Sequence, residues 1–208
     1  AIHLIMGFTR QPQIITWLRP GIDADFCWLA PAGHVVGPSV SLVNCSKGVS
    51  SEGVLINSGY GVVAATIPSL YGTTWTEIGV VKLDGSSQLP ALSARDTGQA
   101  VVFTPASSLI NLVMWALIDV NISGAALPLG TYHYVARRDG SSHSVWVNGK
   151  LYGTASNATS PVGSSSTLPA IGSQAGSGAR QGLTPLSATS GVYMVTRTKR
   201  VLSDSKCL

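Results

Sequence analysis

Apolar and polar residues alternate in short runs along most of the chain, and turn residues separate each run from the next. A period of two places every second side chain on one face of a β-strand. From residue 53 onward the runs recur about every 8–12 residues, which is typical of a β-sandwich or barrel. The pattern predicts two packed antiparallel sheets with less than about 10% helix. The predicted strands are Gly53–Asn57, Val62–Ile67, Trp75–Leu83, Ala100–Thr104, Leu109–Asn121, Tyr132–Arg138, Ser144–Val147, Lys150–Ala155 and Gly191–Thr198.

Residues 1–50 follow a different pattern and form a separate predicted region, before a sandwich domain over residues 51–208. Prolines break this region into short apolar pieces that contain Trp17, Phe26 and Trp28. Such pieces are compatible with the first strands of the sandwich or with an arm that docks on a neighbouring subunit. Under the second hypothesis these three aromatic residues make intermolecular contacts.

Residues 130–155 predict two consecutive hairpins. Apolar side chains alternate through Tyr132–Arg138 and again through Ser144–Val147. Asp139-Gly140 begins the first turn, and Asn148-Gly149 forms the second, where a type I′ turn needs positive φ at both central residues. Trp146 faces away from its two valine neighbours, so it is a candidate for a sugar-stacking platform or a subunit contact.

The same stretch resembles the laminin-G-like and concanavalin A-like jelly rolls, which read roughly G-x-W-H-H-V-A, then D-G-S, then L-Y-V-N-G. Tyr132 stands at the tryptophan position, His133 at the first histidine, and Tyr134 replaces the second. Residues 192–204 are similar to the closing strand of these families and to their R-x-L-S-D segment, where Ser203 is the expected N-cap of a short C-terminal helix. Over residues 53–208 the resemblance implies an all-β, two-sheet antiparallel jelly-roll sandwich. The fold hosts lectins, hydrolases, adhesins and virion proteins, so it does not define an activity.

Charged residues make up only 11% of the 208 residues, against about 25% in typical soluble domains. So low a content of charged residues favours a homo-oligomer or an assembly component. The net charge is +4, and the one tight basic cluster contains Arg197, Lys199 and Arg200. This cluster is too small to indicate a nucleic-acid partner.

Cysteine spacing and hydropathy exclude several classes of site. The three cysteines contain no CxxC pair, which disfavours a zinc site, and their odd number disfavours a disulfide framework. We expect buried or idle thiols, as in a reducing cytosol, and a Cys27–Cys45 bridge is the alternative. No apolar run has the length of a transmembrane helix, and no signal segment is expected.

Catalytic and metal-binding residues are sparse in the sequence. Asp23 and Asp25 form the only i, i+2 pair of acids, and a capping role in turns suits them better than catalysis. The four histidines are scattered, so no triad is expected. We expect no cofactor; calcium is the alternative, with Asp84, Asp96, Asp119 and Asn121 as the dispersed candidates.

These observations predict a non-enzymatic virion protein of a tailed bacteriophage, on the capsid surface or in a tail fibre. Its partners would be copies of itself, other virion proteins and surface glycans, and it would be made in the host cytoplasm. The alternative is a secreted or cell-surface carbohydrate-binding lectin-like domain, which would be extracellular. A glycan hydrolase is the third hypothesis.

Overall fold

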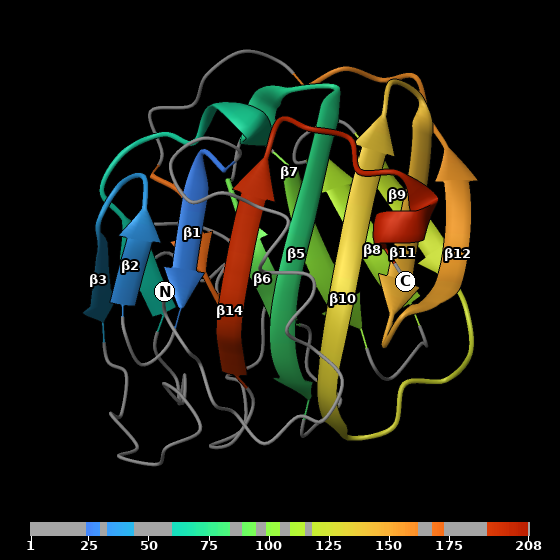
Figure 1. Cartoon of the computed structure of the whole chain (residues 1–208), viewed down its shortest axis with the longest axis horizontal. Helices are drawn as coiled ribbons and strands as arrows, with labels where there is room; N and C mark the ends of the chain where they lie inside the picture. Colours follow the sequence, from blue (N-terminus) through green and yellow to red (C-terminus); the bar gives the residue numbers. More distant parts are fainter. Residues whose placement is uncertain are drawn as a thin grey trace.

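Two seven-stranded antiparallel sheets pack face to face in the computed structural model, which describes residues 24–29, 33–43, 60–83, 89–94, 99–104, 109–114, 118–161, 168–172 and 191–207. Figure 1 looks onto the first sheet, here called sheet A, with most of sheet B behind it. The predicted all-β, two-sheet sandwich is confirmed. Sheet A runs in the order β12 (Lys150–Ser156), β11 (Ser142–Val147), β10 (Gly130–Asp139), β5 (Thr74–Leu83), β14 (Gly191–Thr198), β1 (Phe26–Leu29) and β2 (Gly33–Val36). Sheet B runs in the order β3 (Val40–Val43), β4 (Tyr60–Val63), β13 (Ala170–Ile171), β6 (Leu89–Ser93), β7 (Gln99–Thr104), β8 (Leu109–Met114) and β9 (Ile118–Ser123).

The main core lies between the sheets and is built from the alternating side chains that the sequence predicts. Tyr134 and Ala136 of β10 face inward beside Val145 of β11. The ring of Phe103 from sheet B meets the ring of Tyr134 edge to face, with centroids 5.0 Å apart. Such a pair contributes about 0.5–1.5 kcal/mol beyond its buried area, so it helps to set how the two sheets stack.

A second apolar cluster lies on the outer face of sheet A. Ile78, Val135, Trp146 and Met194 pack there against Leu202 and Cys207 of the C-terminal segment. Figure 1 shows this segment, in red, crossing in front of sheet A and ending in the short turn η3 (Asp204–Lys206). The C-terminal residues therefore cover an apolar surface that the sheet would otherwise expose to water.

The described part of residues 1–50 belongs to the sandwich. β1 pairs with β14, β2 pairs with β1, and β3 pairs with β4 of the other sheet. Phe26 and Trp28 are core residues with 0% and 2% exposure. The hypothesis of first strands therefore describes this part of the region, and the arm hypothesis does not; Trp17 lies outside the described residues.

The two sheets also meet along one side, where the edge strands β9 and β12 run close together. A Cβ atom at Gly153 of β12 would lie 2.6 Å from the carbonyl oxygen of Ser123 in β9. Only glycine fits such a close backbone approach. Two edge strands that cover each other are shielded from pairing with another chain.

Three local predictions need correction. The predicted strand Leu109–Asn121 is a hairpin, since Leu109 of β8 pairs with Ser123 of β9; the sequence between them lacks the glycine and proline turn signals used to divide strands. β6 was missed because Pro90 interrupts its alternation. The C-terminal helix is a single 3-10 turn, and Ser203 makes no side-chain cap hydrogen bond. Gly53–Asn57 lies outside the described residues.

The predicted type I′ turn is confirmed: φ is 49° at Asn148 and 75° at Gly149. Asn148 also fastens this turn to β10. Its backbone N–H donates to the carbonyl oxygen of His133, and its Oδ1 accepts the backbone N–H of His133 at 3.0 Å.

We expect Gly149→Val to destabilise the protein by roughly 1–3 kcal/mol, because a β-branched residue resists positive φ. Urea unfolding would measure the change, with the exposed Lys150→Val as a matched control. Equal stabilities for the two variants would contradict the turn assignment.

Candidate functional site

The largest concentration of polar side chains lies inside the sandwich and is centred on an ion pair. Glu77 of β5 and Arg197 of β14 are register partners on adjacent strands, and both face inward. Arg197 Nη1 lies 2.6 Å from Glu77 Oε2, and both side chains have 0% exposure. Bringing two charges out of water costs several kcal/mol per ion, so the surrounding groups must compensate.

Two aromatic side chains flank this ion pair. The Tyr134 hydroxyl donates to Glu77 Oε1 at 2.8 Å, and the Arg197 guanidinium stacks 3.6 Å from the centroid of the Trp75 ring. Gly79 makes room for the tyrosine, because a Cβ atom there would lie 2.4 Å from Tyr134 Cε1. The carboxylate thus receives a second donor, and the cation lies on the electron-rich face of a tryptophan.

The ion pair also connects to the 3-10 turn η1 (Pro68–Tyr71). Arg197 Nη2 donates to the Ser69 carbonyl oxygen at 3.2 Å. The Ser69 backbone N–H and hydroxyl both donate to the Asp25 carboxylate at 3.0 Å. Asp25, just before β1, therefore fixes η1 over the end of the sandwich, in agreement with the turn-capping role predicted for it; Asp23 lies outside the described residues.

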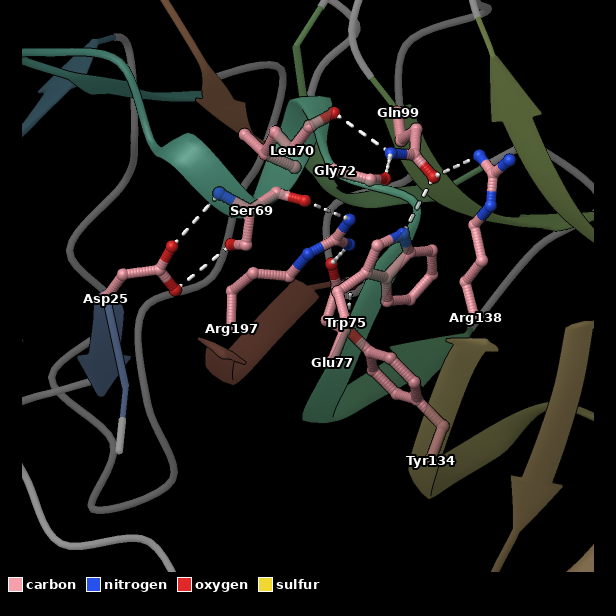
Figure 2. A network of polar contacts seen from close by, with 10 residues as sticks. All are labelled: Asp25, Ser69, Leu70, Gly72, Trp75, Glu77, Gln99, Tyr134, Arg138 and Arg197. Atoms are coloured by element: carbon pink, nitrogen blue, oxygen red, sulfur yellow. Dashed lines mark hydrogen bonds and ion pairs between the residues drawn. The ribbon is translucent and has the colours of Figure 1, made fainter. Parts of the chain in front are cut away.

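Gln99 of sheet B is the hub of the second half of the network. Its Oε1 accepts from Trp75 Nε1 at 2.7 Å and from Arg138 Nη1 at 3.2 Å. Its Nε2 donates to the carbonyl oxygens of Leu70 and Gly72 around η1. Figure 2 shows how this one amide joins both sheets and the turn, with Arg197 and Arg138 on its two sides.

Burial controls the electrostatics of the network. It raises the pKa of Glu77, against the opposing effects of Arg197 and of the hydrogen bond from Tyr134. It also raises the pKa of Tyr134 well above its usual value, and the neighbouring Glu77 charge acts in the same direction. Burial lowers the pKa of Arg197, and Glu77 opposes that shift. The tyrosine is therefore neutral near pH 7, and it stays a hydrogen-bond donor.

A tyrosine paired with a carboxylate and an arginine is a set of groups that can carry chemistry in a glycosidase. Here Tyr134 is 1% exposed, and Glu77 and Arg197 are 0% exposed. A substrate cannot reach groups that both sheets cover. In this structure these side chains bond to one another within sheet A and to η1, and the Tyr134 ring packs against Phe103 of sheet B.

This network was not among the features predicted from the sequence. Trp75 and Glu77 share one face of a predicted strand, so a buried glutamate next to a tryptophan was a usable signal. The predicted basic cluster does not exist as a surface cluster, because Arg197 points inward while Lys199 and Arg200 are exposed.

The three predicted interaction residues that the structure describes do not gather at one surface. Trp146 does face away from the core valines, but it is 3% exposed and lies 4.8 Å below the Arg137 guanidinium. Arg137 Nη1 donates to the Leu202 carbonyl oxygen and pairs with Asp204. Trp146 therefore anchors the C-terminal segment and is not an exposed platform.

The remaining candidates give no site in the part of the chain that is described. Cys27 and Cys207 are free thiols, and Cys45 lies outside this part. Burial raises the pKa of Cys27, and it raises that of Cys207 to about 11.

No group of three or more His, Cys, Asp and Glu side chains able to hold a metal occurs among the described residues. Of the calcium candidates, Asn121 is exposed on β9, while Asp84, Asp96 and the Asp119 side chain are not described. No helix in the described ranges is long and apolar enough to span a membrane.

Comparison with known proteins gives structural relatives only: no family model and no curated protein sequence matches the chain. The binding domain of botulinum neurotoxin DC, solved in complex with SialylT, matches with a TM-score of 0.63 and 10% identity, over 89% of this chain and 50% of that one. Trypanosoma rangeli sialidase, solved with 2,3-difluorosialic acid as a covalent intermediate, matches with a TM-score of 0.60 and 15% identity. That match covers 90% of this chain and 32% of the sialidase. This chain thus spans about half the length of the neurotoxin domain and about a third of the length of the sialidase. The likeness shows a shared β-sandwich fold.

We expect Arg197→Met to destabilise the protein by roughly 3–5 kcal/mol, because it leaves the buried Glu77 carboxylate without its counter-ion. The double variant Glu77→Leu/Arg197→Met should recover part of that loss. Chemical denaturation of both variants, with the exposed Lys150→Met as control, would measure this. Additive losses in the double variant would contradict the coupling.

Proposed function

We propose that this protein is a non-enzymatic β-sandwich module that acts by binding. The observation that carries the proposal is the complete burial of Glu77, Tyr134 and Arg197, the groups best suited to chemistry. The other inward ionisable side chains serve the architecture as well: Asp25 fastens η1, and Arg138 bonds to Gln99. The functional contacts of such a module lie on its surface and loops.

The specific setting that we propose is the virion of a tailed bacteriophage, on the capsid surface or in a tail fibre, where the chain contacts neighbouring subunits. Two sequence observations support it: the low content of charged residues and the resemblance to the laminin-G-like and concanavalin A-like jelly rolls, a fold that also hosts virion proteins. The structural relatives add that this fold occurs as one part of longer chains.

The second candidate is a secreted or cell-surface lectin-like domain that binds carbohydrate. Two structural relatives favour it, because the neurotoxin binding domain was solved with SialylT and the sialidase with 2,3-difluorosialic acid. We therefore include sialylated glycans among the ligands to be tested, together with neutral ones.

Self-association tests the subunit contacts. Light scattering over a range of protein concentrations should give a mass above the 21.5 kDa of one chain. Mass spectrometry of purified phage particles from the source should then detect the chain. A strict monomer that is absent from particles and binds glycans would reject the virion proposal in favour of the lectin.

Enzyme assays test the absence of catalysis. We expect no release of product from fluorogenic glycosides, sialosides included, above a matched blank. If product is released, Tyr134→Phe tests whether the buried network is responsible for the turnover, since it removes only the hydroxyl that donates to Glu77. Loss of turnover in a variant that remains folded by circular dichroism would overturn the proposal.

A further inference from the structure

A buried histidine lies opposite a buried arginine at the end of the sandwich that carries the β10–β11 turn. His143 of β11 is the register partner of Arg138 in β10 and of Ala155 in β12. The exposed fractions of His143 and Arg138 are 1% and 0%. His143 Nδ1 lies 3.1 Å from the Ser141 carbonyl oxygen. A carbonyl oxygen only accepts, so Nδ1 carries the proton of the neutral ring, and acid adds a second proton at Nε2.

Arg138 holds the loops at this end. Its Nε donates to the Gly140 carbonyl oxygen at 2.9 Å, and its Nη2 donates to the Thr159 carbonyl oxygen at 2.5 Å. The Ser141 carbonyl oxygen, which accepts from His143, also accepts the backbone N–H of Asn157 at 2.7 Å. The turn 139–142 and the segment 157–161 are thus fastened to each other and to the interior through Arg138 and His143.

The charges around His143 oppose its protonation. Among the described residues, Arg138 of β10 is the charged group that faces His143; β12 presents Ala155, and sheet B presents the neutral amide of Gln99, which bonds to Arg138. Farther into the interior, Glu77 and Arg197 form their own ion pair, and Tyr134 donates to Glu77. Burial, and then Arg138, lower the pKa of His143 from 6.5 to about 4, against the opposing effect of the Ser141 carbonyl.

We propose that His143 is an acid-sensitive switch: its protonation places a second cation beside Arg138 and releases the turn 139–142 and the segment 157–161 from the sandwich. In the open form, with the turn 139–142 and the segment 157–161 released, the imidazole takes up a proton at its ordinary pKa of 6.5. In the closed form, with both fastened to the sandwich, the pKa of the imidazole is about 4. The open form binds more protons between these values. The closed form keeps its full stability above about pH 6.5 and loses it as the pH falls towards 4. This inference does not depend on what the module binds.

The test measures local opening by amide hydrogen exchange, corrected for the intrinsic pH dependence of exchange. From pH 7.5 to pH 5 the opening constant at Gly140 and Asn157 should rise about thirtyfold, which follows from the two pKa values. His143→Asn places an amide donor near the Nδ1 position without a titrating group, so its opening should stay constant over this range. His133→Asn, at a half-buried histidine on the neighbouring strand β10, should behave as the unmodified protein does.

An equal rise in His143→Asn, or a rise spread evenly over both sheets, would overturn the proposal. If His143→Asn does not fold, NMR titration of the unmodified protein decides. A ring pKa near 4, accompanied by shifts of the Gly140 and Asn157 amides, supports the switch, and an ordinary ring pKa rejects it.

Discussion

The buried ion pair between Glu77 and Arg197 is the interaction on which the rest of the interior depends. Two charges without solvent are costly, and the partners around them offset part of that cost. Tyr134 supplies a donor to the carboxylate, Trp75 supplies a ring face to the guanidinium, and Ser69 supplies a carbonyl acceptor. Each partner is held in turn by its own strand or turn, so the pair requires the whole end of the sandwich to be in place.

The network joins parts of the chain that are far apart in sequence. Asp25 lies just before β1, Gln99 in β7 and Arg197 in β14, yet bonds through η1 and Trp75 connect all three. Contacts of this kind are costly to form early in folding, because long loops must close first. The same contacts oppose local opening of this end once folding is complete, and they leave the acidic and basic groups without access to solvent.

Sheet A is stabilised from both sides. Its inner face carries the polar network and the main core, while its outer face is covered by the C-terminal segment through Leu202 and Cys207. Thr76 fastens this segment by donating to the Arg200 carbonyl oxygen and accepting the Leu202 backbone N–H. Three of the four aromatic residues that sequence alone suggested for intermolecular contacts lie in the described part of the chain and are used inside the molecule: Phe26 and Trp28 on one face of the sheet, and Trp146 on the other.

The sequence by itself determined the local features of this protein. Period-two alternation defined most strands, and the Asn148-Gly149 dipeptide defined a turn whose positive φ values are observed. These signals are local, since they depend on neighbours a few residues apart. The tertiary structure alone decided that Glu77 meets Arg197, that Arg138 faces His143, and that Leu202 and Cys207 pack in one cluster with Trp146. Such pairings depend on which strands become neighbours and in what register, and a one-residue shift would turn each side chain to the opposite face.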